Sequence, residues 1–244
     1  RDLVRSRGLG DVYKRQVEPV EAAEHKGYRL GLWVKDDMAG IGTLTYFDQD
    51  GNFGALGHGI GNGQTKDLLR LSDGRLYKAQ VLGIKKGVRG TPGELEGVVY
   101  YGKDNQIGEV SSNTQIGIYG TLTKNFREEK KNESLLCPVG YKQEIQTKDA
   151  VILSDASGEL QSYRIVIDDL DYTPGDKNKG IRFHVEDENL LKLTGGIVQG
   201  LSGSPILQDG KLIGAVTHVL VNDPTKGYGI FVEKMTGNKI GQKT

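Results

Sequence analysis

Residues 195–206 read GGIVQGLSGSPI, a stretch that holds four glycines and two serines in twelve positions. Such small residues add little to a hydrophobic core, so the stretch predicts a sharply bent backbone rather than a packed element. One explanation is a tight turn before the apolar residues that follow. The other is a bend that presents the hydroxyl of Ser202 and aims backbone amides at a bound group.

The chain around this stretch has the pattern of an all-β protein. From Tyr28 onward, short runs rich in β-branched and aromatic residues follow one another, and several alternate polar with apolar side chains. Turn sequences such as DQDGN and QDGK separate them. This spacing predicts a barrel or a sandwich. The expected strands are 28–34, 41–47, 76–84, 95–101, 114–123, 149–154, 160–167, 180–185, 210–221 and 228–233.

Helical patterns are rare in this sequence. Residues 186–196, EDENLLKLTGG, begin with acidic residues and end in glycine, which predicts one short helix. The charged run NFREEKKNES at 125–134 is interpreted as a solvated loop, and as the joint between two β halves near 125–140. The short motif shared by 41–45 and 119–123 agrees with two related halves.

Composition excludes several classes of function. Lysine plus arginine and aspartate plus glutamate both total 32, so the chain lacks the positive charge that nucleic acids attract. Cys137 is the single cysteine and is expected to be a small buried residue, not a nucleophile. The four histidines lack metal-ligand spacing, so we expect no metal and no cofactor. No stretch has the length of a membrane span or a signal-peptide core.

The N-terminal residues do not share the β pattern. Residues 1–16 are basic and aperiodic, and they resemble translated sequencing-adapter tails, so we interpret them as non-native. Residues 17–27 are interpreted as a linker from a missing upstream domain, and residues 28–244 as one domain.

A serine nucleophile needs a base to take its proton and hydrogen-bond donors for the oxyanion that forms. In this stretch the amides of Gly200 and Ser202 can converge if Gly200 adopts a backbone conformation closed to residues with a Cβ. Gly203 leaves room for a substrate. Ser204 is a weaker candidate, because it points the other way in an extended segment and precedes proline.

Histidine is the side chain best suited to act as a base near neutral pH. His25 lies in a charged segment, and His184 and His218 lie within expected strands, where a structural role is ordinary. His58 lies between two glycines at the end of a strand, so we predict that it is the base. It precedes Ser202 by 144 residues, which places one residue in each half, in the order found in two-barrel serine proteases.

Two longer stretches carry a family resemblance. AGIGTLTYFDQDGNFGALGHGI at 39–60 and TGGIVQGLSGSPILQDGKLIGAVTHVLVNDPTKGYGIFVE at 194–233 resemble the histidine and serine signatures of the stage IV sporulation protein B (SpoIVB) serine peptidase family. The likeness runs from about residue 28 to about residue 235. It implies a chymotrypsin-like double β-barrel and a serine endopeptidase, with Ser202 as nucleophile and His58 as base.

The resemblance also implies an acidic residue shortly before the serine, a place that Asp187 fits best. Glu186, Asp155 and Asp104 remain alternatives, since two-barrel proteases usually take this residue from the first half. Leu201 stands where trypsin-like enzymes have aspartate, so activation by a new N-terminal amine is excluded. Regulation by self-cleavage or by a partner domain is expected instead.

Further expectations concern the substrate. In two-barrel proteases the strand after the nucleophile forms one wall of the specificity pocket, so Thr217, His218 and Val219 are predicted to contact substrate. The family implies a PDZ domain and a membrane anchor before the peptidase, and a location outside the cytoplasm, between the mother-cell and forespore membranes. The implied substrate is a regulatory subunit of a membrane-embedded protease complex. The alternative function is a non-catalytic β module that binds peptides by strand addition.

Overall fold

The structure is a computed structural model that describes residues 20–21, 28–29, 39–62, 67–71, 73–130, 136–173 and 175–237. The chain forms two compact units, 1–39 and 40–244. In the first, β1 (Val20–Glu21) pairs antiparallel with β2 (Tyr28–Arg29). The predictions for 1–16, for most of the linker 17–27 and for strand residues 30–34 lie outside the described residues.

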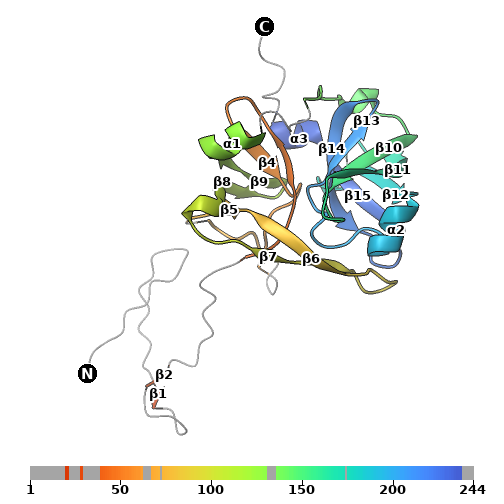
Figure 1. The fold of residues 1–244 in the computed structure, drawn as a ribbon. Coiled ribbons are helices and arrows are strands. Elements are labelled where there is room, and N and C mark those ends of the chain that lie inside the picture. The colour runs from red at the N-terminus through yellow and green to blue at the C-terminus, as the bar shows by residue number, and fades with distance from the viewer. Residues whose placement is uncertain are drawn as a thin grey trace. The chain divides into compact units, whose positions relative to one another are not determined.

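The C-terminal half of the second unit is a closed antiparallel barrel (Figure 1). Alternate side chains along its strands, such as Ile165 and Ile167, point inward and are almost fully buried. Around the barrel, the strand order is β10 (Asp149–Ser154), β11 (Gln161–Leu170), β12 (Ile181–Val185), β15 (Lys226–Phe231), β14 (Lys211–Val219) and β13 (Pro205–Gln208).

The N-terminal half of the second unit contains a five-stranded antiparallel sheet with its own small core, which includes Phe53 and Leu122. A hairpin of two further strands, β6 (Ala79–Lys85) and β7 (Glu94–Val99), forms a separate sheet. The order in the larger sheet is β3 (Leu44–Phe47), β4 (Asn52–Ala55), β9 (Gly117–Leu122), β8 (Gln106–Thr114) and β5 (Arg75–Tyr77).

The predicted all-β class is confirmed. The strand prediction differs from the structure in several details. The run 76–84 is two strands, because the backbone of Lys78 leaves the ladder and donates to the carbonyl of Asn105 at 2.9 Å. β8 was not predicted at all, and β4 and β13 lie outside the expected strand ranges.

The helix predictions were right at one place and wrong at another. The predicted short helix at 186–196 is α2 (Glu188–Thr194), but the charged run expected to be a loop forms α1 (Lys124–Lys130). There Phe126 packs against the first-half core, and Lys124 pairs with Glu128 one turn later. The remaining helices are α3 (Val232–Thr236) and the 3₁₀ turns η1 (Lys103–Asn105) and η2 (Lys142–Glu144).

Two further observations concern the chain as a whole. Cys137, expected to be buried, is only half-buried and remains a free thiol. None of the helices in the described ranges has the length and apolar content needed to cross a membrane.

Candidate active site

The loop before β13 carries Ser202 on a strained backbone that only glycine accepts readily. Gly200 has a φ of 101°, the kind of conformation predicted for it, and Gly203 has a φ of 95°. The first half holds this loop in place. The amide of Thr43 donates to the carbonyl of Ser202 at 3.0 Å, and the Thr45 hydroxyl donates to the carbonyl of Gly203 at 2.8 Å.

The amides in this loop divide into two sets. Those of Leu201, Gly203 and Ser204 donate to backbone carbonyls within 3.2 Å. Those of Gly200 and Ser202 donate to no acceptor within the part of the chain that the structure describes. The N–H groups on either side of Leu201 are therefore available to an oxyanion, of the kind that forms on a carbonyl oxygen when a serine hydroxyl attacks the carbonyl carbon.

The two serines of the loop have different environments. Ser202 is half-buried, and its hydroxyl donates to the carbonyl of Thr217 at 3.0 Å. Ser204 is fully buried, and its hydroxyl has no partner among the described residues. Of these two serines, only Ser202 is partly accessible to solvent.

His58 follows β4 in a tight bend. Leu56 and Gly57, which precede it, both adopt positive φ angles, 67° and 68°. The Nδ1 atom of His58 lies 2.9 Å from the carbonyl oxygen of Gly59. A carbonyl only accepts, so Nδ1 carries the proton and Nε2 holds the lone pair that a base needs.

The loops that carry Ser202 and His58 both contact the same part of β14. A Cβ placed on Gly57 would lie 2.8 Å from the side chain of Thr217, whose carbonyl binds Ser202. His218 follows Thr217 in β14, and the centroid of its ring lies 5.5 Å from the centroid of the His58 ring. The bend before His58 also touches the serine loop, since a Cβ on Gly203 would lie 2.7 Å from the amide of Leu56.

This geometry agrees with the outcome of a comparison with known protein families. The model described as SpoIVB peptidase S55 matches residues 26–236. The chain belongs to the SpoIVB peptidase S55 family. It is therefore a serine peptidase, and the resemblance stated from the sequence is confirmed.

Solved structures and curated proteins were compared as well. Two crystal structures of Rv3671c from Mycobacterium tuberculosis H37Rv, both inactive forms and one a Ser343Ala mutant, share 14% identity with this peptidase. The mutant aligns over 57% of this chain and 70% of its own, with a TM-score of 0.35; the other aligns over 68% and 86%, with 0.36. No curated protein matched.

The three predicted substrate-contacting residues of the peptidase differ in exposure. Thr217 is buried, and its hydroxyl lies 2.7 Å from the carbonyl of Asn178, so its side chain anchors β14 and only its backbone faces Ser202. His218 and Val219 are half-buried.

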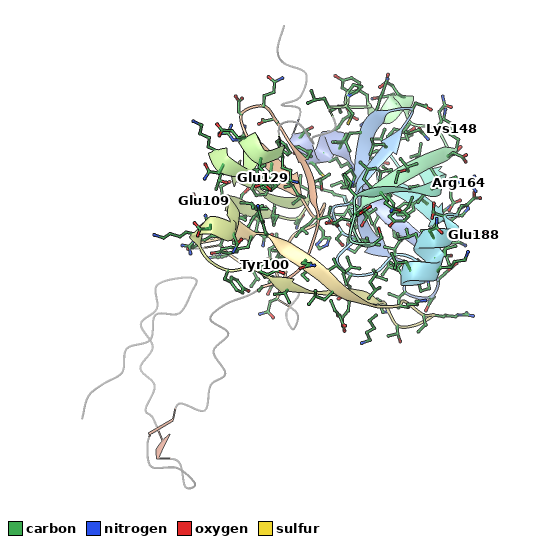
Figure 2. The ribbon with its side chains drawn as sticks, in the orientation of Figure 1. Tyr100, Glu109, Glu129, Lys148, Arg164 and Glu188 are labelled. Carbon is green, nitrogen blue, oxygen red and sulfur yellow. The ribbon has the colours of Figure 1, made fainter. Side chains whose placement is uncertain are left out.

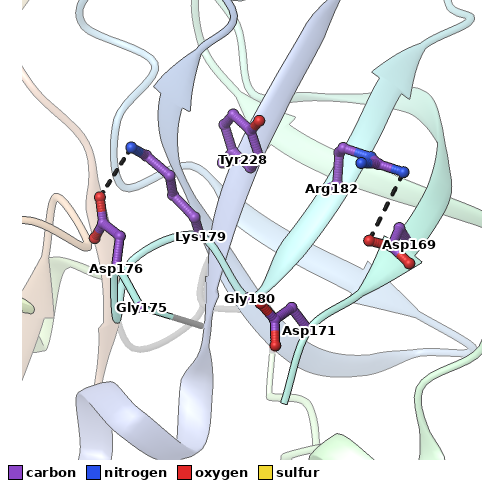
Figure 3. Close-up of a pocket in the computed structure, with 8 residues that line it drawn as sticks. All are labelled: Asp169, Asp171, Gly175, Asp176, Lys179, Gly180, Arg182 and Tyr228. Atoms are coloured by element: carbon purple, nitrogen blue, oxygen red, sulfur yellow. Dashed lines mark ion pairs between the residues drawn. The ribbon is translucent and has the colours of Figure 1, made fainter. Parts of the chain in front are cut away.

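The ring of His218 contacts that of His58, and in the barrel sheet His218 pairs with Tyr228, which lines a polar pocket of about 240 Å³ (Figure 3). In that pocket Lys179 pairs with Asp176 at 2.9 Å and lies over the ring of Tyr228. Burial, then the nearby His58 and Lys179, lower the pKa of His218 to about 4, although Asp176 acts in the opposite direction. His218 is therefore neutral at neutral pH and adds no charge beside His58.

We expect His218→Phe to make the peptidase less sensitive to acid. The folded-state pKa lies below the ordinary value of 6.5, so unfolding takes up a proton as the pH falls from 6.5 to 4, and stability is lost over that window. The variant should lose about 1–2 kcal/mol less between pH 7 and pH 4, allowing for solvent screening of the partly exposed ring. Urea unfolding at several pH values measures this. Parallel stability curves for parent and variant would contradict it.

Asp187 has contacts that belong to a helix cap. Its carboxylate accepts from the amides of Asn189 and Leu190 in the first turn of α2, at 3.0 and 3.1 Å, and from that of Arg164 at 3.3 Å. Figure 2 shows Arg164 and Glu188 on the side of the barrel away from the first half, which carries His58. The orienting role of Asp187 stays a prediction.

The three alternative acids have other contacts or surroundings. Glu186 pairs with Arg164 at 3.0 Å. Asp155 is exposed and lines a groove of about 380 Å³ together with Gly200. Asp104 is exposed in η1. In the described chain, the group that binds Nδ1 of His58 is a backbone carbonyl, for which the sequence carries no signal.

The two roles of Asp187 predict different results. Asp187→Ala is expected to lose about 1 kcal/mol of unfolding free energy, because two amides of α2 lose their acceptor, while Asp187→Asn keeps most of that stability. Chemical denaturation measures both variants. Equal stability of Asp187→Ala and the parent would contradict the cap. A fall of about 10⁴-fold in the serine-labelling rate of Asp187→Asn would support the orienting role.

Proposed function

We propose that this chain is a serine endopeptidase in which Ser202 is the nucleophile and His58 the general base. The observation that carries the proposal is the pair of unengaged amides at Gly200 and Ser202, next to a half-buried hydroxyl. Membership of a peptidase family favours this function over a peptide-binding module without catalysis.

The proposed reaction begins with a rotation of the Ser202 side chain. Its hydroxyl leaves the carbonyl of Thr217 and turns to Nε2 of His58. Oγ then attacks the scissile carbonyl carbon while its proton passes to Nε2. The carbonyl oxygen becomes an oxyanion bound by the amides of Gly200 and Ser202.

The second half of the reaction restores the enzyme. The tetrahedral intermediate collapses, the peptide C–N bond breaks, and the imidazolium gives its proton to the leaving amine. Water then attacks the acyl-enzyme with His58 again as base, and the new carboxyl group leaves as Ser202 regains its proton. The bond from Nδ1 to Gly59 holds the imidazole in the required tautomer through both steps.

The biological role is proposed from the family. The substrate is a protein, and we propose a regulatory subunit of a membrane-embedded protease complex in a sporulation pathway. The full protein is proposed to carry a PDZ domain and a membrane anchor, to act outside the cytoplasm between the mother-cell and forespore membranes, and to be regulated by self-cleavage. His218 and Val219 would contact the substrate beside the nucleophile.

Labelling with a fluorophosphonate tests the proposed chemistry. The reagent is attacked by an activated serine and leaves a stable phosphonyl ester, so we expect one adduct per chain, mapped by peptide mass spectrometry to Ser202. An adduct on Ser204, or none on protein that circular dichroism shows to be folded, would overturn the assignment.

A further inference from the structure

We propose that the β6–β7 hairpin holds the oxyanion-binding amides in position, and that Leu95 is its positioning residue. This inference rests on the proposed function, since it explains how the amide of Gly200 keeps its direction. The hairpin belongs to the first half, whereas Gly200 belongs to the second.

The backbone of β7 pairs with the residue directly before Gly200. The amide of Leu95 donates to the carbonyl of Gln199, and the amide of Gln199 donates to the carbonyl of Gly93, both at 2.8 Å. Glu94 and Gln199 thereby form a short parallel bridge. These two bonds fix the orientation of the 198–199 and 199–200 peptide groups. The second of these groups contains the amide of Gly200.

The side chain of Leu95 covers the other side of this peptide. A Cβ placed on Gly200 would lie 2.9 Å from each of three Leu95 side-chain carbons. Leu95 is half-buried and packs against the second-half core. The space into which the 199–200 peptide would rotate is therefore filled, and the amide of Gly200 stays free of internal acceptors.

The hairpin takes its position from the second half. Among the described residues, its two strands pair only with each other and with Gln199. Its tip is bound as well, since the amide of Gly87 donates to the carbonyl of Thr194 and that of Gly90 to the carbonyl of Val221, both at 2.8 Å. Figure 1 shows the hairpin reaching from the five-stranded sheet to the barrel.

The hairpin also offers a matched control. Leu82 lies on β6, is the same residue type as Leu95, and is 65% exposed. Truncation of Leu82 removes as many atoms from the same hairpin without touching the serine loop. A difference between the two truncations therefore reports the face of the hairpin on which Leu95 contacts Gly200 and the second-half core, and not the loss of a leucine from the hairpin as such.

The test compares fluorophosphonate labelling rates of Leu95→Ala and Leu82→Ala with the parent across a range of pH, at a temperature where all are folded. The phosphoryl oxygen of the reagent occupies the oxyanion site, so the plateau rate of Leu95→Ala should fall about 10–100-fold. The pH midpoint should stay unchanged, because His58 is not disturbed. Leu95→Met should restore most of the rate, and Leu82→Ala should match the parent.

Each outcome decides the inference. A parent that labels at Ser202 while Leu95→Ala labels equally fast would overturn the positioning role and leave the proposed function standing. A parent that does not label would overturn the proposed function and this inference with it. If Leu95→Ala does not fold, Leu95→Val replaces it, with an expected fall of a few-fold. Equal losses in Leu82→Ala would also contradict the proposal.

Discussion

Replacement of Ser202 by alanine is expected to lower peptidase activity by about 10⁵–10⁶-fold and to abolish fluorophosphonate labelling. The substitution removes the oxygen that we propose forms the acyl-enzyme, while the amides of Gly200 and Ser202 remain. Among the described residues, the hydroxyl makes one hydrogen bond, to the carbonyl of Thr217, so the unfolding free energy should change by only about 1 kcal/mol. Cleavage of an unstructured protein such as casein, followed by gel electrophoresis, measures the activity.

Ser204→Ala is the control for this prediction. It makes the same chemical change two residues away, at a buried hydroxyl that has no partner among the described residues. Removal of an unsatisfied buried hydroxyl costs little, so this variant should label and cleave like the parent. Activity retained by Ser202→Ala and lost by Ser204→Ala would exchange the two assignments. Activity retained by both would point to a different nucleophile.

The sequence predicted those parts of the site that depend on local backbone conformation. Gly200 was expected at a sharp bend because glycine alone accepts positive φ at low cost, and it has that conformation. Gly203 was expected to leave room for a substrate, but it also has a positive φ, and the backbone of Thr43 and Leu56 fills the space beside its Cα. His58 was selected by its position between glycines at the end of a strand, and the structure brings its loop to the loop of Ser202. Both signals lie within a few residues of the side chain concerned.

The supports of the site could not be predicted, because they come from distant parts of the chain. The hydroxyl of Thr43 donates to the carbonyl of Gly200 at 3.1 Å across 157 residues, and Leu95 reaches Gln199 from a separate hairpin. Neither pair carries a pattern that distinguishes it from other strand residues. Such contacts follow from the way the two halves pack, which no local spacing encodes.

Asp187 and α1 show how a local signal can be interpreted in two ways. The sequence Asp-Glu-Asn-Leu is a helix start, and the structure uses the Asp187 carboxylate in that way. Its predicted role next to His58 came from the family pattern alone. In α1 the charges were visible, but Phe126 decided the outcome by supplying an apolar contact with the core.

Replacement of His58 by alanine is expected to reduce activity and labelling to nearly the same extent as replacement of Ser202, by about 10⁵–10⁶-fold. A serine hydroxyl without a base is a weak nucleophile, so the two residues act as one unit and their losses are not additive. The double variant should therefore be no slower than either single variant. Rates of casein cleavage for the two single variants and the double variant measure this.

His184→Ala is the matched control for His58. His184 pairs with Asp168 at 2.7 Å on the outer face of the barrel and has no contact with the serine loop in the described chain, so its loss should leave the rate unchanged.

Added imidazole should restore part of the activity of His58→Ala, because the vacated and partly exposed space next to Ser202 admits a free base. It should restore none to Ser202→Ala, which retains its base but lacks the oxygen. A His58→Ala variant that cleaves within tenfold of the parent would show that another group takes the proton. Of the described residues, His218 is then the first to replace, since its ring is the one in contact with that of His58.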